Sequence, residues 1–212
     1  MAASGNDPFS VDNASQPFTC SMPDSVFIPF DPPISLINGL SLRAFNTLYY
    51  HRQLRKIVDS RISYGPFFYP LDGIRHWNRL YGKQGFQQYQ CVIPGANGKE
   101  AITAIMAEIA HSGTGSFLAV LKQCGDIVSP GLLSFPMSGV SLALDFPQRE
   151  VNTALFARLD DLVHEAGGGR LYPAKDAHMQ AGHFKRAYPA WTEVERLRDP
   201  KLLSRFWKRV TQ

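Results

Sequence analysis

The spacing of apolar and polar residues in the second half of the chain predicts a regular series of strands and helices. Strands alternate at every second residue, whereas helices carry apolar residues at every third or fourth position. We expect strands at residues 86–93, 116–124, 140–146 and from Arg170, and helices at 97–112 and 150–166. This order predicts an α+β fold of the ferredoxin-like split βαβ type, in which one face of an antiparallel sheet carries both helices.

The ends of the two predicted helices carry sequence signals. Asn97, followed three residues later by Glu100, resembles a capping box at the start of the first helix. Three consecutive glycines at 167–169 are typical of a helix end, and they predict where the second helix stops.

The regions on either side of this unit are predicted to be less regular. Residues 1–42 are rich in proline, serine, asparagine and aspartate and favour an extended arm, while residues 42–59 have the spacing of an amphipathic helix. Gly65, Pro66 and Pro70 favour a loop or an edge strand at 64–70. The expected organisation is an arm with a helix (1–60), a ferredoxin-like substrate domain (61–168) and a C-terminal segment (169–212) with helices near 180–187, 192–198 and 202–210.

Strand periodicity also predicts which side chains face away from the helices. Gln88 and Gln90 alternate with apolar residues on one strand, and Ser141 and Ala143 do so on another. Lys122 lies near the end of the strand between them. These side chains form either the solvated face of a two-layer domain or a hydrogen-bonding floor for a polyhydroxylated ligand, and periodicity alone favours neither.

Charge and composition exclude several classes of function. The formal charge is +4, and four cations (Lys201, Arg205, Lys208 and Arg209) crowd the last predicted helix, as at a solvated helix end or, alternatively, at a phosphate or nucleic-acid contact. The predicted open face lacks the aromatic residues that stack on RNA bases, so no nucleic-acid partner is expected. The histidines and cysteines lack zinc spacing, so no metal is expected. Without a signal peptide or a membrane-spanning apolar run, the sequence predicts a cytoplasmic protein.

Three blocks of motifs stand out between Tyr64 and Arg209. They are Tyr69-Pro70-Leu71-Asp72 with Gly85-Phe86-Gln87-Gln88, Leu133-Ser134-Phe135-Pro136 with Leu144-Asp145-Phe146-Pro147, and Gly169 to Asp176. Together they resemble the C-terminal part of FAD-linked oxidases of the vanillyl-alcohol-oxidase type, most closely the decaprenylphosphoryl-ribose oxidase branch. The resemblance implies a substrate (cap) domain and a C-terminal return into an FAD domain. It also implies that FAD is held mainly by an N-terminal half outside this chain.

The resemblance assigns a catalytic role to Lys175. This residue resembles the family lysine that lies beside the flavin pyrimidine edge and the substrate oxygen. A fixed ammonium there stabilises the negative charge that develops at flavin N1 and the C2 carbonyl when hydride reaches N5. Tyr172 resembles a tyrosine that contacts the flavin, so Tyr172 and Lys175 are the predicted cofactor-binding residues.

The predicted substrate-binding residues come from the open face of the sheet. Gln88 and Gln90 resemble the amides of the family's substrate pocket, and Lys122 resembles its lysine. Ser141 and Ala143 stand where some members carry asparagine and cysteine. Phe68, which lies in an aromatic segment, is predicted to close over the substrate.

The sequence therefore supports two hypotheses. In the first, the chain is the substrate-binding half of an FAD-dependent oxidoreductase that oxidises a CH–OH group of a sugar, a sugar-lactone or a related polyol, and it is inactive in isolation. In the second, it is a non-catalytic ferredoxin-like ligand-binding module. An FAD-binding partner is expected only in the first case.

Overall fold

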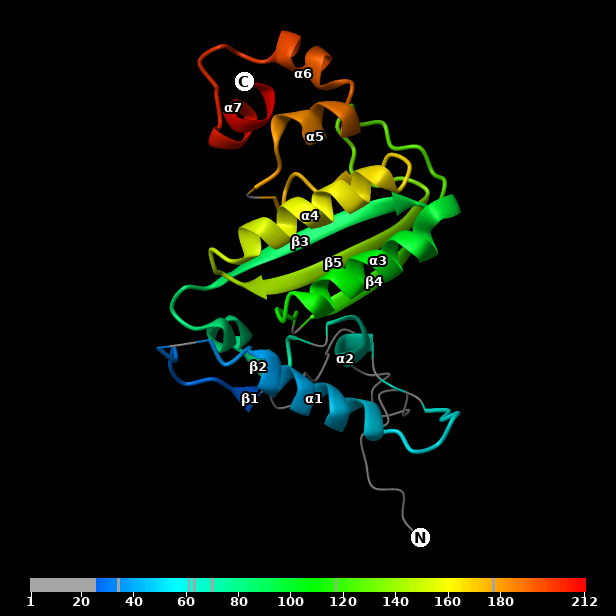
Figure 1. The fold of residues 1–212 in the computed structure, drawn as a ribbon, viewed down its shortest axis with the longest axis vertical. Coiled ribbons are helices and arrows are strands. Elements are labelled where there is room, and N and C mark those ends of the chain that lie inside the picture. The colour runs from blue at the N-terminus through cyan, green and yellow to red at the C-terminus, as the bar shows by residue number, and fades with distance from the viewer. Residues whose placement is uncertain are drawn as a thin grey trace, which may run out of the picture.

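The computed structural model describes residues 26–212 except for residues 34, 61, 63, 70, 117 and 177. Residues 1–25 of the predicted arm (1–42) lie outside the described residues. Figure 1 shows three tiers, with the C-terminal helices at one end, the main sheet with its two long helices in the middle, and the N-terminal elements at the other end.

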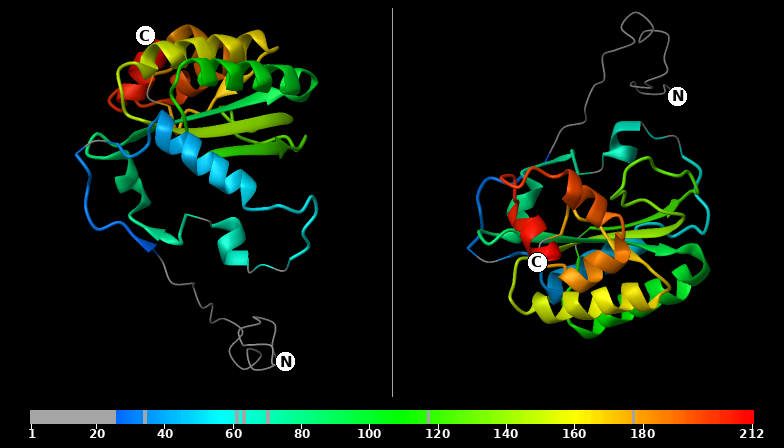
Figure 2. Two further views of the ribbon diagram at one scale, coloured as in Figure 1. Left: turned by 60° about the horizontal axis from the view of Figure 1, so that its bottom comes forward. Right: turned by 90° about the horizontal axis from the view of Figure 1, so that it is seen from above.

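Four strands form the main sheet: β3 (Phe86–Pro94), β4 (Ala119–Cys124), β5 (Gly139–Pro147) and β6 (Arg170–Leu171). Their order is β4-β5-β3-β6 and all neighbours are antiparallel. Two helices connect them, α3 (Gly98–His111) and α4 (Asn152–Glu165), and Figure 2 shows both on the same face of the sheet. This is the ferredoxin-like arrangement that the sequence predicted.

The core lies between the sheet and these helices. Tyr89, Cys91 and Ile93 of β3 and Leu142, Leu144 and Phe146 of β5 are buried there. From α4, Leu159 and Val163 pack against them with no exposed surface. Each fully buried side chain of this kind contributes roughly 1.5–3 kcal/mol, so the alternating pattern fixes which face of each strand meets the helices.

Three helices follow the main sheet: α5 (Ala181–Ala187), α6 (Trp191–Leu197) and α7 (Arg205–Thr211). They lie close to the three predicted positions. Phe184, Tyr188 and Trp207 join the main core, so the C-terminal segment is packed onto the ferredoxin-like unit. The hydroxyl of Tyr188 donates to the carbonyl of Leu171 over 2.6 Å, which attaches this segment to β6.

The N-terminal part contains a parallel pair of two-residue strands, β1 (Val26–Phe27) and β2 (Ile74–Arg75), with the helices α1 (Gly39–His51), α2 (Tyr64–Phe68) and η2 (Trp77–Tyr81). The helix α1 ends at His51, eight residues before residue 59, where the predicted helix ends. Of its residues, Leu42 is the buried one, so little packing supports further turns.

Two local predictions were wrong. Residues 64–68 form the helix α2 and not a loop or edge strand. Pro66 is compatible with a helix there because it lies in the first turn, where no backbone N–H is needed. Asn97 occupies the N-cap position of α3, directly after the 3-10 turn η3 (Gly95–Asn97), but its side chain makes no capping hydrogen bond, so the predicted capping box does not form. Its side chain instead donates to the carbonyl of Ala166 over 3.1 Å, which connects the start of α3 to the end of α4.

Candidate functional site

The turn after β6 places Lys175 beside the central strand β3. The N–H of Tyr172 donates to the carbonyl of Gln90 over 2.8 Å, which extends the pairing of β6 with β3 by one residue. The N–H of Lys175 then donates to the carbonyl of Tyr172 over 3.1 Å and closes the turn. The sequence 172–175 therefore delivers an exposed lysine to the rim of the sheet.

A shallow concavity lies at this rim, with about 160 Å³ of empty space that includes space open to solvent and with no room for a water-sized sphere between its walls. Its lining includes four residues that the sequence predicted for the site: Gln88, Gln90, Tyr172 and Lys175. Tyr89, Leu171, Asp176 and His178 complete the lining. The structure thus brings together the predicted catalytic lysine, the predicted flavin-contacting tyrosine and the two predicted substrate amides.

The other predicted site residues lie outside this concavity. Ala143 is the strand partner of Gln90, and Lys122 is exposed on β4 as the partner of Ser141. Ser141 is only 4% exposed, so the expectation that it lies on an open surface was wrong. Arg170 on β6 lies two strands away from Ser141, in the same row of paired residues. Its guanidinium donates to the carbonyl of Ser134 over 3.0 Å, so residues near 134 approach the end of the face where Ser141 lies.

Phe68 is exposed on α2 and does not line the concavity.

Asp145 is a site residue that the sequence analysis did not select. It is the strand partner of Gln88, it is 2% exposed, and its Oδ1 accepts a 2.8 Å hydrogen bond from the Gln88 amide. Burial raises the pKa of the Asp145 carboxyl, while the Gln88 hydrogen bond and the charge of Lys175 act in the opposite direction. A carboxylate among polar residues on the predicted open face was the sequence signal that could have identified it.

Asp176 and helix α7 hold the turn that carries Lys175. The Asp176 Oδ1 atom accepts from the backbone N–H groups of His178 (2.9 Å) and Met179 (2.7 Å). Its Oδ2 accepts from the guanidinium of Arg209 on α7. These bonds fix the backbone next to Lys175 and make its position depend on where α7 packs.

We expect the substitution Ser204→Ala to lower the free energy of unfolding by about 1 kcal/mol. Ser204 is the N-cap of α7, and its hydroxyl accepts from the N–H of Trp207 over 3.0 Å. Chemical denaturation measures the change, with Ser60→Ala, at an exposed residue, as the control. Equal stability of the two variants would contradict this role of the cap.

A second polar network lies on the helix side of the sheet. The Asp160 carboxylate, on α4, is 1% exposed and accepts from the hydroxyl of Tyr89 (3.1 Å) and from His178 Nε2 (3.2 Å). The Gln87 amide lies 3.2 Å from the other ring nitrogen of His178. This network links β3, α4 and the segment after β6, and it supports the concavity from behind.

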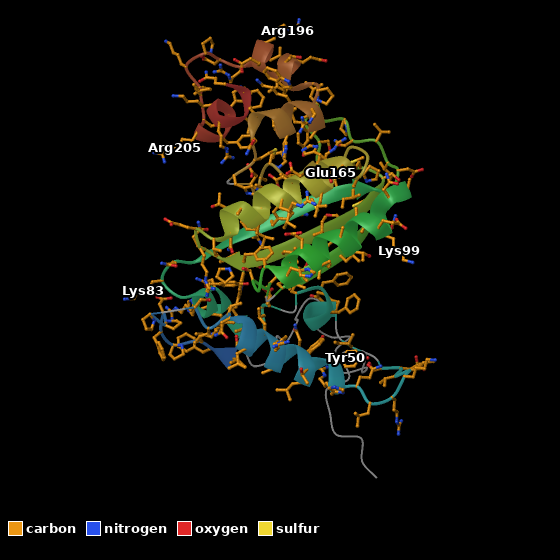
Figure 3. All side chains as sticks on the ribbon, in the orientation of Figure 1. Tyr50, Lys83, Lys99, Glu165, Arg196 and Arg205 are labelled. Carbon is orange, nitrogen blue, oxygen red and sulfur yellow. The ribbon has the colours of Figure 1, made fainter. Side chains whose placement is uncertain are left out.

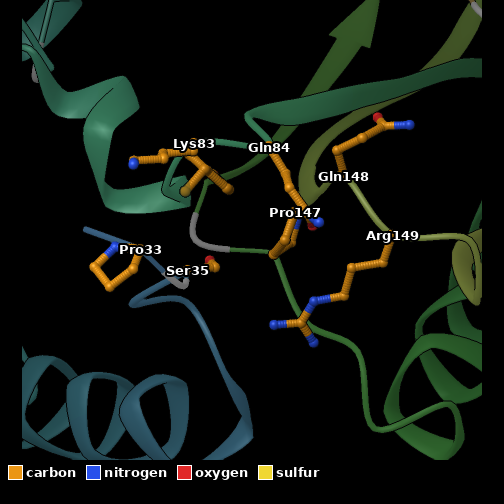
Figure 4. Close-up of a pocket in the computed structure, with 8 residues that line it drawn as sticks. Pro33, Ser35, Lys83, Gln84, Pro147, Gln148 and Arg149 are labelled. Atoms are coloured by element: carbon orange, nitrogen blue, oxygen red, sulfur yellow. The ribbon is translucent and has the colours of Figure 1, made fainter. Parts of the chain in front are cut away.

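A larger hollow, of about 480 Å³ including space open to solvent, lies elsewhere. Figure 4 shows its polar lining between the segment around Pro33 and the ends of β3 and β5, with Lys83, Gln84 and Arg149 around it. It shares no residue with the concavity at Lys175. The smaller concavity is the candidate site because it, and not the larger hollow, is lined by residues that the motifs assign to the site.

Many large apolar side chains are exposed in the N-terminal part of the structure. Leu48, Tyr50, Leu54, Ile57 and Phe67 are between 64% and 91% exposed. Exposed apolar surface of this extent is typical of proteins that bind another polypeptide.

Two further findings concern the described part of the chain. It contains no group of three or more histidine, cysteine, aspartate or glutamate side chains that could hold a metal ion. None of the helices in this part combines the length and apolar composition that a membrane crossing requires.

The fold and the rim of its sheet thus define an α+β domain of ferredoxin-like topology with a polar concavity. The chain is homologous to the decaprenylphosphoryl-beta-D-ribose oxidase of Mycolicibacterium smegmatis, with 35% identity over 192 residues, which are 87% of this chain and 40% of the oxidase. It is also 32% identical over 117 residues, 54% of this chain, to an uncharacterised protein in the mprA 5' region of Streptomyces coelicolor, covering 31% of that protein. No family model matches the chain.

The homology confirms the resemblance to oxidases of the decaprenylphosphoryl-ribose branch. The relationship is to the C-terminal region of the oxidase. The chain spans less than half the length of either relative.

Proposed function

We propose that this chain is the substrate-binding half of an FAD-dependent oxidoreductase that oxidises a CH–OH group of a sugar, a sugar-lactone or a related polyol. The observation that carries this proposal is the convergence of Lys175, Tyr172, Gln88 and Gln90 on one concavity, in a chain homologous to a sugar oxidase. A cation, an aromatic ring and two amides are the groups that a flavin ring and a polyhydroxylated substrate require.

The residues at the rim fit the ring part of FAD. Lys175 is exposed and has no ion pair with a carboxylate among the described residues, so its ammonium is available to a ligand. Tyr172 is partly exposed next to it. Lys175 would place a positive charge at the pyrimidine edge, and Tyr172 would contact the ring. The FAD, when bound, accepts the hydride.

The FAD pyrophosphate requires groups that the concavity does not offer. The sequence has no glycine-rich loop of the kind that binds a pyrophosphate. We infer that a separate FAD-binding half supplies that site and packs against this chain, and the exposed apolar residues of the N-terminal part support such a partner.

Hydrogen bonds from the polar side chains of the sheet recognise the substrate. Gln88, whose Nε2 is bonded to Asp145, offers an acceptor, Gln90 offers a donor and an acceptor, and Lys122, farther along the same face, offers a donor. Such groups suit a ring with several hydroxyls. The ribose in the name of the homologous oxidase supports a sugar as the substrate class.

Co-expression with an FAD-binding half of the related oxidase tests the proposal. We expect a yellow complex that oxidises a sugar substrate, and a colourless protein when this chain is purified alone. A co-purified pair without flavin, or a flavin-containing pair that no sugar or polyol reduces, would contradict the proposal and favour a non-catalytic ligand-binding module.

A further inference from the structure

The side chain of Gln88 is held from one side. Its Nε2 donates to Asp145 Oδ1 over 2.8 Å, and the carboxylate accepts this bond from a buried position on the neighbouring strand. A carboxylate can only accept hydrogen bonds, so it binds the NH₂ end of an amide and repels the carbonyl end. In its ionised form, the Asp145 side chain therefore selects one of the two orientations of the Gln88 amide.

The other end of the Gln88 amide is open. Its Oε1 accepts no hydrogen bond from the described residues and is not among the buried unpaired atoms. Gln88 itself lines the concavity that contains Lys175. With Nε2 fixed on Asp145, the residue offers a carbonyl oxygen, and hence an acceptor, to a ligand in the concavity.

The backbone that carries the Asp145 carboxylate is held by a hydrogen bond to the neighbouring segment. The N–H of Asp145 donates to the hydroxyl of Ser116 over 2.8 Å, just beyond the paired part of β4. Asp145 Oδ2 is buried and has no hydrogen-bond partner among the described residues. Among the described residues, Gln88 is therefore the one hydrogen-bond partner of the Asp145 carboxylate.

We propose that Asp145 is a positioning residue that orients the Gln88 amide so that its carbonyl oxygen accepts a hydrogen bond from a substrate hydroxyl. Lys175, across the concavity, donates to the oxygen of the same or a neighbouring hydroxyl. The acceptor and the donor together select a CH–OH group over a carbonyl, which has no proton to donate. The inference rests on the proposed function for the identity of the ligand, but the orientation of the amide is a property of this chain alone.

Nuclear magnetic resonance on the ¹⁵N-labelled full chain tests the orientation directly. We expect the side-chain NH₂ protons of Gln88 to exchange with water at least about ten-fold more slowly than those of Gln90, because a buried charge-assisted hydrogen bond protects them. Gln90 is the matched internal control, since its strand partner is Ala143. Equal exchange rates at the two residues would overturn the inference.

The substitution Asp145→Asn keeps the shape of the side chain but supplies both a donor and an acceptor, so it no longer selects one amide orientation. The Gln88 signal should then lose its protection while that of Gln90 is unchanged. Because this variant could fail to fold, Gln88→Ala provides a second test: the pKa of the Asp145 carboxyl, followed by ¹³C resonance, should rise further. Lys175 also acts on this carboxyl, and it remains in the variant. An unchanged pKa would overturn the inference.

Kinetics in the assembled oxidoreductase separate positioning from structure. With decaprenylphosphoryl-beta-D-ribose as the substrate, Asp145→Asn should raise KM about ten-fold with a smaller change in kcat. In a Gln88→Ala background the same substitution should have no further effect, whereas in a Gln90→Ala background its effect should persist. Additive effects with Gln88→Ala would overturn the inference. If the resonance results hold but the wild-type complex does not oxidise any sugar, the proposed function fails and the positioning of Gln88 stands.

Discussion

Replacing Lys175 by methionine is expected to lower the rate of flavin reduction in the assembled oxidoreductase by about 100- to 1,000-fold, the usual cost of removing one preorganised group that stabilises developing charge. Lys175 lines the concavity and is exposed to solvent. Because the side chain is exposed, its removal should leave the free energy of unfolding of the chain within about 0.5 kcal/mol of the wild-type value.

Stopped-flow measurement of flavin absorbance gives the rate, and chemical denaturation gives the stability. Lys99→Met is the matched control, because Lys99 is an exposed lysine on α3 that projects from the helix layer, as Figure 3 shows. An unchanged reduction rate in Lys175→Met, or an equal loss in the Lys99 variant, would remove Lys175 from the catalytic role.

Stability is expected to fall steeply as the solution is acidified, because of His164. This histidine lies on α4 with its ring centroid 4.2 Å from that of His183, and its Nε2 is buried without a hydrogen-bond partner among the described residues. Burial, followed by the charges of His183 and Arg186, lowers its pKa to about 4, against the opposing effect of Asp160 and Asp161.

The sign of the effect follows from proton uptake. Above the pKa of about 6.5 that His164 has in the unfolded chain, the residue is neutral in both states and stability is complete. Between pH 6.5 and about 4, the unfolded chain binds a proton on His164 that the folded chain does not, so the free energy of unfolding decreases as the pH is lowered. The total loss is about 3 kcal/mol at most. The raised pKa of Asp145 contributes with the opposite sign, since its folded form takes up a proton first.

Comparison with a variant isolates the contribution of His164. Chemical denaturation between about pH 7.5 and 4.5 should show a weaker pH dependence in His164→Gln than in the wild type. His111→Gln, at an exposed histidine near the end of α3, should retain the full dependence. The same slope in the wild type and in His164→Gln would show that His164 is not held neutral in the fold.

The parts of the fold that the sequence predicted are those where periodicity and burial agree. The strands around Tyr89 and Leu144 alternate cleanly because one face meets the helices, so the pattern alone predicts which side chains of each strand enter the core. The glycines at 167 and 168 adopt positive φ angles and end α4 as expected. The strand that follows them could therefore be predicted, and with it the position of Tyr172 and Lys175 at the sheet rim.

The errors and omissions arose where tertiary contacts outweigh local pattern. Asn97 has the sequence of a cap, yet its amide binds the end of another helix. Ser141 has the alternation of an exposed residue and is buried. Asp145 alternates with the apolar residues of its strand, but neither its burial nor its bond to Gln88 can be deduced from one strand, because both depend on how β3 and β5 are paired.

The central claim is that Lys175 of this chain places its positive charge against a flavin held mainly by another polypeptide. The midpoint potential of the flavin in the assembled complex tests this most directly, because a nearby cation favours the reduced, more negative flavin. We predict that Lys175→Met lowers the two-electron potential by about 30 mV or more, which corresponds to at least about 1.4 kcal/mol of lost stabilisation. A potential that is the same in the wild type and in Lys175→Met would contradict the account.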